Sequence, residues 1–157
     1  MFIVEKKNSD QQYRGYFERI QRKDLPHMKK PPWGFTWRYE LSNPHREVYK
    51  LLVEGSNDIQ AGISFEYHEG FILVEVIESA PYNRNDTSGL KVAPTLFAFA
   101  SKTSFDKGFD GYVAIHIKRG NQKLIKLYLD LGASHLSNDR LVLDTFASRQ
   151  LINIYYR

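Results

Sequence analysis

Apolar and polar residues alternate with a period of two through the middle of the chain, and this alternation is typical of half-buried β-strands. It runs through three segments, residues 48–54 (VYKLLVE), 59–67 (IQAGISFEY) and 71–79 (FILVEVIES). Residues 55–58 (GSND) and 68–70 (HEG) connect these segments and have the composition of turns. The sequence therefore predicts three consecutive strands that form an antiparallel meander.

A helical spacing takes over in the second half of the chain. The segment from Pro94 to Phe105 predicts a helix with a proline in its first turn, where proline is best tolerated, and Gly108 stops it. Residues 111–117 (GYVAIHI) are apolar enough for a strand covered on both faces, as a parallel strand reached through a crossover helix would be. The remaining predicted elements are a helix over residues 121–133, a hairpin around residues 137–139, a strand over residues 140–144 and a last helix with Ala147, Leu151, Ile154 and Tyr155 on its apolar side.

The first 45 residues have a less regular pattern. Residues 2–6 (FIVEK) predict a short edge strand, and the segment from Ser9 onward predicts a helix because Tyr13, Phe17 and Ile20 are about one helical turn apart.

Two consecutive prolines disfavour a helix within residues 25–33 and mark that segment as a connector. Residues 35–41 (FTWRYEL) have the aromatic and β-branched content of a strand, and residues 42–44 (SNP) follow as a turn.

Together these elements predict one α+β domain over residues 1–157. Its expected order is an antiparallel meander, a β-α-β-α unit and a closing β-hairpin, in a mixed central sheet with helices on both faces.

Composition and charge narrow the classes of function. A chain of 157 residues with 42% apolar and 25% charged residues is typical of one globular domain with a substantial core. The apolar runs are too short to span a bilayer and the N-terminus lacks the pattern of a signal peptide, so we expect a cytoplasmic protein. The formal net charge of +4 favours an anionic partner.

Several kinds of chemistry are disfavoured by the sequence. It contains no cysteine, which excludes disulfides, thiolate metal sites and a cysteine nucleophile. No phosphate-loop, dinucleotide-binding or serine-hydrolase motif is present. The histidines are scattered singly, so no metal site is expected; they are His27, His45, His68, His116 and His135.

The helix predicted over residues 121–133 carries the most specific pattern in the chain. Asn121 is a candidate N-cap, Gly132 is a candidate C-terminal stop, and Tyr128 places a phenol within an aliphatic stripe, where it must find a hydrogen-bond partner or face a cleft. The run N-x-x-L-x-x-x-Y-x-x-x-G-A from Asn121 to Ala133 resembles the pattern N-x-x-A-x-x-x-Y-x-x-x-G-[FA] of the GNAT superfamily of N-acyltransferases. The resemblance covers roughly residues 47–144 and extends to the order of the predicted elements.

The resemblance implies that acetyl-CoA is the co-substrate and that an acetyl group moves to a primary amine by direct attack. The family binds the pyrophosphate of coenzyme A with a Q/R-x-x-G-x-G/A turn, where helix N-terminal amides hold the phosphates. One register in this chain uses Arg84, Thr87 and Gly89. The other, which we prefer for its place beside the helix start, ends at Ala93.

The preferred register puts Ser88 and Lys91 in the conserved positions of the turn, with Gly89 giving the loop freedom and Lys91 or Arg84 supplying charge. Main-chain amides at the end of the third meander strand would bind the pantetheine arm, and Asn121 would add a polar contact. The cofactor-binding residues that the resemblance implies are Ile77, Glu78, Ser79, Arg84, Ser88, Gly89, Lys91, Val92, Ala93 and Asn121.

The resemblance also implies two catalytic roles. Tyr128 would be the general acid that protonates the departing thiolate, and its alternative is a core tyrosine with a satisfied hydroxyl. Glu75 would be the base that deprotonates the amine, and its alternative is a place on a solvated sheet face or in a structural ion pair. Glu78 is the reserve candidate for the base.

Two functions of other classes remain open at this point. A non-catalytic GNAT-like module would serve as a binding or partner protein. A nucleic-acid binder would use the aromatic and basic residues of the N-terminal third; these are Lys29, Lys30, Trp33, Phe35, Trp37, Arg38 and Tyr39. For the enzyme, the sequence leaves the acceptor open, as a small-molecule or peptide amine.

Overall fold

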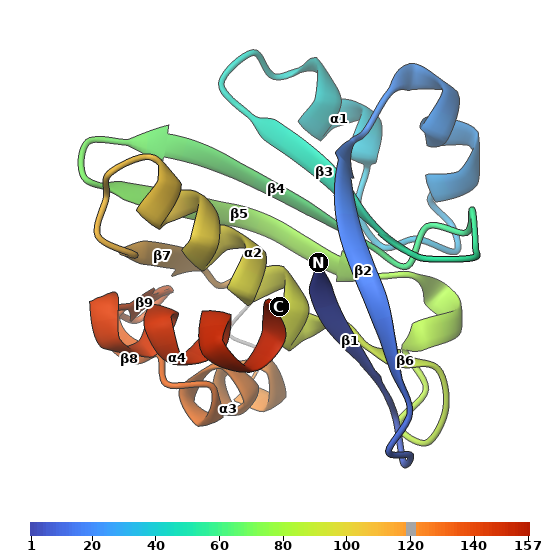
Figure 1. The fold of residues 1–157 in the computed structure, drawn as a ribbon. Helices are drawn as coiled ribbons and strands as arrows, with labels where there is room; N and C mark the ends of the chain where they lie inside the picture. Colours follow the sequence, from blue (N-terminus) through green and yellow to red (C-terminus); the bar gives the residue numbers. More distant parts are fainter. Residues whose placement is uncertain (119–121) are drawn as a thin grey trace.

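The computed structural model describes residues 1–118 and 122–157 (Figure 1). In these residues nine strands form one mixed sheet in the order β6-β1-β2-β3-β4-β5-β7-β9-β8. Neighbouring strands are antiparallel except for β5 and β7, which are parallel. The strands are β1 (Phe2–Lys6), β2 (Gln12–Arg19), β3 (Glu47–Val53), β4 (Ala61–His68), β5 (Phe71–Ser79), β6 (Leu90–Lys91), β7 (Val113–His116), β8 (Ser134–Ser137) and β9 (Arg140–Leu143).

Helices cover both faces of the sheet, as the sequence predicted. They are α1 (Trp37–Ser42), α2 (Ala93–Asp106), α3 (Gln122–Asp130) and α4 (Thr145–Tyr155), with the 3-10 helices η1 (Arg22–Met28) and η2 (Pro81–Asn83). Figure 1 shows α2 and α4 side by side on one face. Leu51 and its neighbour Leu52 on β3 point into different core clusters, Leu51 under α2 and α4 and Leu52 under α1 and η1.

The prediction of a helix from Ser9 onward is wrong, because this segment forms β2 between β1 and β3. A spacing of four residues fits the period of a strand as well as that of a helix. Tyr13 and Phe17 pack on the core under α2, whereas Tyr16 and Ile20 belong to the cluster under α1. Pairing with two distant strands therefore decided the conformation.

The strand predicted for residues 35–41 is also wrong, because α1 occupies most of this segment. Its aromatic content reflects burial and not strand formation, since Trp37 is only 1% exposed. Residues 25–33 are a connector only in part, because η1 extends to Met28 with Pro26 inside it.

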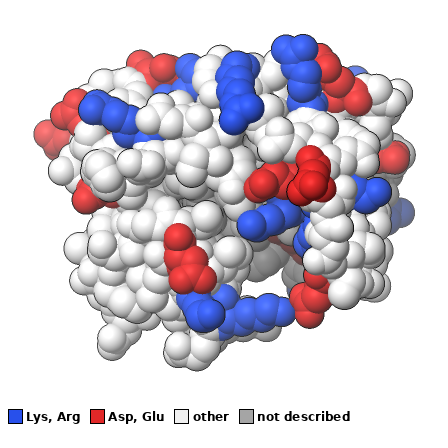
Figure 2. All heavy atoms as spheres, turned by 60° about the horizontal axis from the view of Figure 1, so that its bottom comes forward, with Lys and Arg blue, Asp and Glu red and all other residues white. Residues whose placement is uncertain are grey.

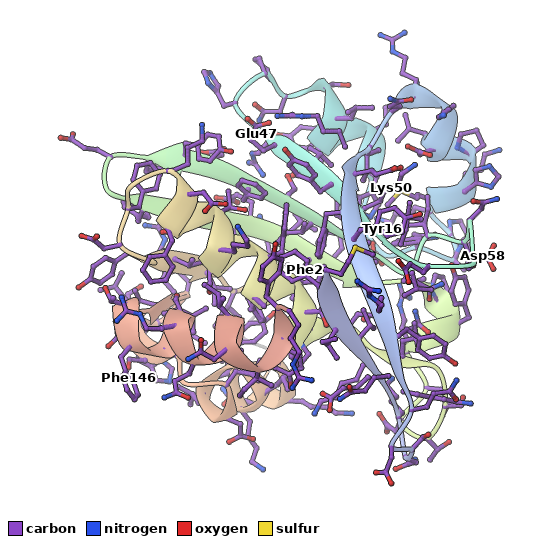
Figure 3. The ribbon with its side chains drawn as sticks, viewed as in Figure 1. Phe2, Tyr16, Glu47, Lys50, Asp58 and Phe146 are labelled. Carbon is purple, nitrogen blue, oxygen red and sulfur yellow. The ribbon has the colours of Figure 1, made fainter. Side chains whose placement is uncertain are left out.

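A buried ion pair fixes η1 against the sheet. Lys50 on β3 donates to Asp24 of η1 at 2.7 Å, and both side chains are about nine-tenths buried. Figure 3 shows Lys50 on the side of β3 that faces η1. Burial opposes the charge of Asp24, but hydrogen bonds from Lys50 and the Gln21 amide outweigh it and lower the pKa of the carboxyl.

The C-terminal elements agree with the sequence in kind and differ in detail. The predicted crossover helix, parallel strand, hairpin and last helix are present as α2, β7, β8–β9 and α4. Ala147, Leu151 and Tyr155 are buried on α4 as expected, but Ile154 is 51% exposed. Phe146, 72% exposed, points away from the molecule (Figure 3). Within the described residues, no helix has the length and apolar character needed to cross a bilayer.

Candidate active site

The sheet opens between β5 and β7. The two strands pair only where Ile72, Leu73 and Val74 face Val113, Ala114 and Ile115. Beyond Val74, β5 continues to Ser79 and, among the described strands, pairs with β4 alone, whereas β7 ends at His116. The parallel strands therefore separate at Glu75, and from there one edge of β5 has no strand partner within residues 1–118 and 122–157.

A β-bulge lies at the same point. Phe65 of β4 faces Val74 and the preceding Ser64 faces Val76, so Glu75 is an extra residue without a partner in β4. Bulges twist a strand and re-aim side chains, and they are frequent beside active sites. At Glu75, therefore, the register between β5 and β4 shifts, and the pairing between β5 and β7 ends.

The open edge of β5 offers backbone groups to a ligand. The amide of Ala80 donates to the carbonyl of Gln60 at 3.0 Å, which directs this residue toward β4. Because the direction alternates along a strand, the N–H and C=O groups of Ile77 and Ser79 are directed away from β4. They face the side of β5 on which β7 no longer pairs. An extended ligand that contains amides can form hydrogen bonds with these backbone groups.

Two connected pockets follow this edge. The first, which we call the carboxylate pocket, has a volume of about 730 Å³ and contains Glu40, Glu75, His116 and Tyr128 in its lining. The second, the cationic pocket, has a volume of about 710 Å³ and is lined by Ile77, Glu78, Ser79 and several cations; these cations are Lys7, Arg84, Lys123 and Lys126.

Four residues line both pockets, so the two form one cleft; they are Gly34, Phe35, Ile77 and Leu124. Figure 2, which brings the underside of Figure 1 forward, shows a hollow in the surface with lysine or arginine side chains along its rim.

Glu75 is held by side chains from two parts of the chain, the end of β7 and the segment before β3. Its Oε2 lies 3.3 Å from His116 Nδ1 at the end of β7, 3.2 Å from Lys118 Nζ, and 3.8 Å from Arg46 Nη2. Burial favours the neutral acid, but the hydrogen bonds from His116 and Lys118 outweigh it, so the pKa of Glu75 lies below its usual value. Glu75 is therefore an ionised carboxylate in the cleft and also a member of an ion-pair network.

Tyr128 lies on α3 across the cleft from β5. The residue is 2% exposed, and the edge of its ring packs at 84° on Phe97 of α2, with the ring centroids 4.8 Å apart. Burial raises the pKa of the phenol well above its usual value, so the hydroxyl keeps its proton. Within the described residues this hydroxyl forms no hydrogen bond, and Tyr128 lines the carboxylate pocket.

Glu78, the reserve candidate for the base, has a different role. Its Oε1 accepts hydrogen bonds from Trp37 Nε1 at 2.8 Å and from the Phe35 amide at 3.2 Å. Its Oε2 accepts from the Gly34 amide and from Arg84. Because four donors surround it, this carboxylate fixes residues 34–37 at the junction of the two pockets. Arg84 also donates to the carbonyl of Pro32 at 3.2 Å.

The structure brings only part of the predicted cofactor site to the cleft. Ile77, Glu78, Ser79 and Arg84 line the cationic pocket. Asn121 lies outside the described residues. The linings of the two pockets, as far as the structure describes them, do not include the proposed phosphate turn, which comprises Ser88, Gly89, Lys91, Val92 and Ala93.

This turn is folded on itself beside β1. Gly89 has a φ of 83°, and a Cβ at this position would lie 2.8 Å from Asn83 Oδ1 and from the carbonyl of Tyr82. The amide of Lys7 donates to Gly89 O at 3.0 Å, and Lys91 pairs with Glu5 in the sheet. The glycine therefore allows the loop to close on η2, and pairing with β1 holds the turn.

Sequence reasoning predicted Arg84 but missed the other cations of the cationic pocket. Lys123 and Lys126 were not singled out, and His116 appeared only as a single histidine. Lys7 gave no signal, because it reaches the cleft from the end of β1 by donating to Asn83 O and Asn85 O at 2.5 Å each. Metal-binding groups of three or more acidic or histidine side chains are absent from the described residues.

Comparisons with known proteins were made at the level of families, sequences and structures. No protein-family model and no curated sequence matches the chain. Mutant forms of the spermidine/spermine N-acetyltransferase from Vibrio cholerae superpose with a TM-score of 0.63 at 13% identity, covering 87% of this chain and 97% of that one. FdhC, described as a nucleotide-linked sugar GNAT, superposes with a TM-score of 0.68 at 11% identity, covering 90% of this chain and 93% of that one.

The ribosomal-protein-S18-alanine N-acetyltransferase from Escherichia coli gives a TM-score of 0.52 at 13% identity, with 82% of this chain and 90% of that chain covered. Identities this low carry information about the fold and not about the acceptor. The open edge between β5 and β7, the bulge at Glu75 and these likenesses agree with the resemblance seen in the sequence: this chain has the fold of the GNAT N-acyltransferases.

Proposed function

We propose that the protein is an N-acetyltransferase that moves an acetyl group from acetyl-CoA to a primary amine by direct attack in a ternary complex. The observation that carries this proposal is the opened edge of β5, where Glu75 at the bulge and Tyr128 on α3 line the same pocket. Two of the proteins of similar fold are a spermidine/spermine N-acetyltransferase and a ribosomal-protein-S18-alanine N-acetyltransferase, and both names describe acetyl transfer to an amine.

The residues of the cationic pocket fit the chemistry of acetyl-CoA. Backbone groups of Ile77 and Ser79 would pair with the amides of the pantetheine arm, as a strand would. The four cations of this pocket would bind the phosphates, and Lys126 forms no ion pair within the described residues. Acetyl-CoA, when bound, supplies the activated thioester.

The proposed reaction needs one proton acceptor and one proton donor. Glu75 takes a proton from the ammonium of the acceptor, so that the amine attacks the thioester carbonyl. The C–N bond forms, the C–S bond breaks, and Tyr128 donates its proton to the departing thiolate; the second proton that the nitrogen loses on becoming an amide restores the phenol. The pKa directions give the starting protonation states that these steps need, because Glu75 is ionised and Tyr128 is protonated at neutral pH.

A path leads the proton from Glu75 to solvent. His116 Nδ1 lies 3.3 Å from Glu75 Oε2, and His116 Nε2 lies 3.6 Å from Asp139 Oδ2, whose side chain is 60% exposed. Histidine exchanges protons readily near neutral pH, so it suits a relay between a buried carboxylate and the surface. Oε1 of Glu75 carries no partner within the described residues and is the oxygen available to the amine.

Binding of acetyl-CoA is the direct test of this proposal. Isothermal titration calorimetry should detect a complex, and the double variant Lys123→Ala, Lys126→Ala should weaken it by about tenfold because two phosphate-facing charges are lost. Lys102→Ala is the matched control, since this lysine lies on α2 and pairs with Asp106. An absence of binding at millimolar acetyl-CoA would contradict the proposed function.

The role of Glu75 has its own test. Glu75→Gln keeps the size of the side chain but cannot accept a proton, so kcat should fall by about 100-fold at pH 7. The loss should shrink as the pH rises, because a growing fraction of the amine then arrives deprotonated. Steady-state rates between about pH 7 and pH 10, a range that approaches the pKa of free amines, measure this. A pH-independent loss would assign Glu75 to structure alone.

The alternatives are less well supported by the structure. Trp33 and Trp37, which would form part of a stacking platform for nucleic acid, are 4% and 1% exposed and belong to the core. A non-catalytic binding module would have no need of both an ionised carboxylate and a protonated phenol in one pocket. The Glu75→Gln and acetyl-CoA experiments together distinguish that module from an enzyme.

A further inference from the structure

The carboxylates of the carboxylate pocket are already neutralised by the protein. Oε1 of Glu40 accepts hydrogen bonds from Arg46 Nη1 and from Ser64 Oγ, each at 2.8 Å, and Glu40 is 6% exposed. Glu75 is held by His116, Lys118 and Arg46, as described above. Neither carboxylate is free to act as the counter-ion of a second ammonium group on an acceptor.

Arg46 is the internal counter-ion of both. Its side chain is 12% exposed and contacts three carboxylates: those of Glu40, Glu75 and Glu66, the last at 2.6 Å from Nε. To bind a second ammonium group, the acceptor would have to displace a buried guanidinium from these partners. Breaking a buried ion pair leaves an uncompensated charge, which makes such a displacement unfavourable.

The free charge in the pocket is positive. Lys30 lines the carboxylate pocket and is exposed, and it forms no ion pair or side-chain hydrogen bond with the described residues. Lys118 lines the pocket from the end of β7, and its side chain is 39% exposed although it reaches Glu75. Phe35 and Tyr39 supply aromatic surface in the same lining.

We propose that the acceptor is an amine that also carries an anionic group, a carboxylate or a phosphate ester, bound by Lys30 while the amine lies at Glu75. This inference rests on the proposed function and names its substrate class. In such a complex the ammonium of the acceptor pairs with Glu75, and its anionic group pairs with Lys30 of the same lining. A polyamine would instead place a second ammonium beside Lys30, where like charges repel.

Matched pairs of amines test this inference. The rate of acetyl transfer is measured from the free thiol of coenzyme A that is released. It is compared between 4-aminobutyrate and butylamine, and between O-phosphoethanolamine and ethanolamine. Spermidine serves as the polycation. The anionic member of at least one pair should have a kcat/KM about tenfold higher than its neutral partner, and spermidine should be the poorest of the set. The pair with the larger ratio tells whether the anion is a carboxylate or a phosphate.

Variants of Lys30 connect the preference to this side chain. Lys30→Ala should remove most of the preference, and Lys30→Glu should reverse it in favour of spermidine, both without a change in the affinity for acetyl-CoA measured by calorimetry. Lys29→Ala is the control, because the neighbouring lysine is also exposed but is not part of the lining of the carboxylate pocket as the structure describes it. A preference that survives Lys30→Glu would overturn the assignment.

The possible failures are distinguishable. If acetyl-CoA does not bind, the proposed function fails. If acetyl-CoA binds and spermidine or a neutral amine is acetylated as well as the anionic amines, the inference about the acceptor fails and the function stands. If none of these amines is acetylated, calorimetry in the presence of coenzyme A compares the binding of the pairs, and equal affinities would overturn the inference.

Discussion

Replacing Tyr128 with phenylalanine should lower kcat of acetyl transfer by about 100-fold and leave the affinity for acetyl-CoA nearly unchanged. The reason is that the variant loses only the hydroxyl. The ring keeps its edge-on contact with Phe97 and its place in the core, because the 2% exposed side chain changes little in volume. Steady-state kinetics and calorimetry with acetyl-CoA measure the two quantities separately.

A second buried tyrosine provides the control. Tyr155 on α4 donates a hydrogen bond to Glu5 at 3.0 Å, and burial raises its pKa to about 12. It does not line either pocket of the cleft. Tyr155→Phe should therefore cost about 1 kcal/mol of stability and leave kcat unchanged. Equal values of kcat for Tyr128→Phe and the wild-type protein would remove Tyr128 from the mechanism.

Replacing Glu78 with alanine should lower the free energy of unfolding by about 3 kcal/mol, the largest effect on stability that we expect in the cleft. Its side chain is 5% exposed and accepts hydrogen bonds from Trp37, two backbone amides and Arg84. The buried indole N–H of Trp37 and the amides lose their acceptor. Arg84, which is 43% exposed, loses less because water can solvate it.

Glu78→Ala should also lower the catalytic efficiency. Glu78 holds residues 34–37 where the two pockets meet, so kcat/KM should fall even under conditions where the variant is folded. Urea denaturation measures the stability, and Glu54→Ala is the control, since the side chain of Glu54 forms, among the described residues, only an exposed pair with Arg14 at 3.9 Å. A loss below about 1 kcal/mol would show that water replaces the carboxylate without penalty.

The sequence predicted those elements whose conformation follows from a single local pattern. Strict alternation set the strands β3, β4 and β5, and a proline start with a glycine stop marked α2. Where two periods fit the same residues, local reasoning failed. Tyr13 and Phe17 satisfy a strand as well as a helix, and only pairing with β1 and β3 distinguished the two.

Residues 35–41 failed for a related reason. The aromatic side chains of this segment indicate burial, and burial is compatible with either a helix or a strand. The contacts that fix the chain at the start of α1 come from Glu78, which lies 41 to 44 residues later in the sequence. Such a contact leaves no trace in the local pattern.

For the site, the sequence by itself determined that Glu75 lies on a strand and Tyr128 on a helix, and that the order of these elements resembles that of the GNAT family. Only the tertiary structure decided what surrounds them. The fold places His116, Lys118 and Arg46 around Glu75, and although burial raises the pKa of the carboxyl, the hydrogen bonds from His116 and Lys118 outweigh it and lower that pKa.

The cofactor side shows the same division. The sequence predicted a phosphate turn at residues 88–93; in the structure Lys91 of this segment pairs with β1, and Lys7, Lys123 and Lys126 line the cationic pocket. Periodicity and caps are properties of neighbouring residues, so the sequence determined most of the elements. Charges act through space between residues far apart in the chain, so only the fold determined the electrostatics of the cleft.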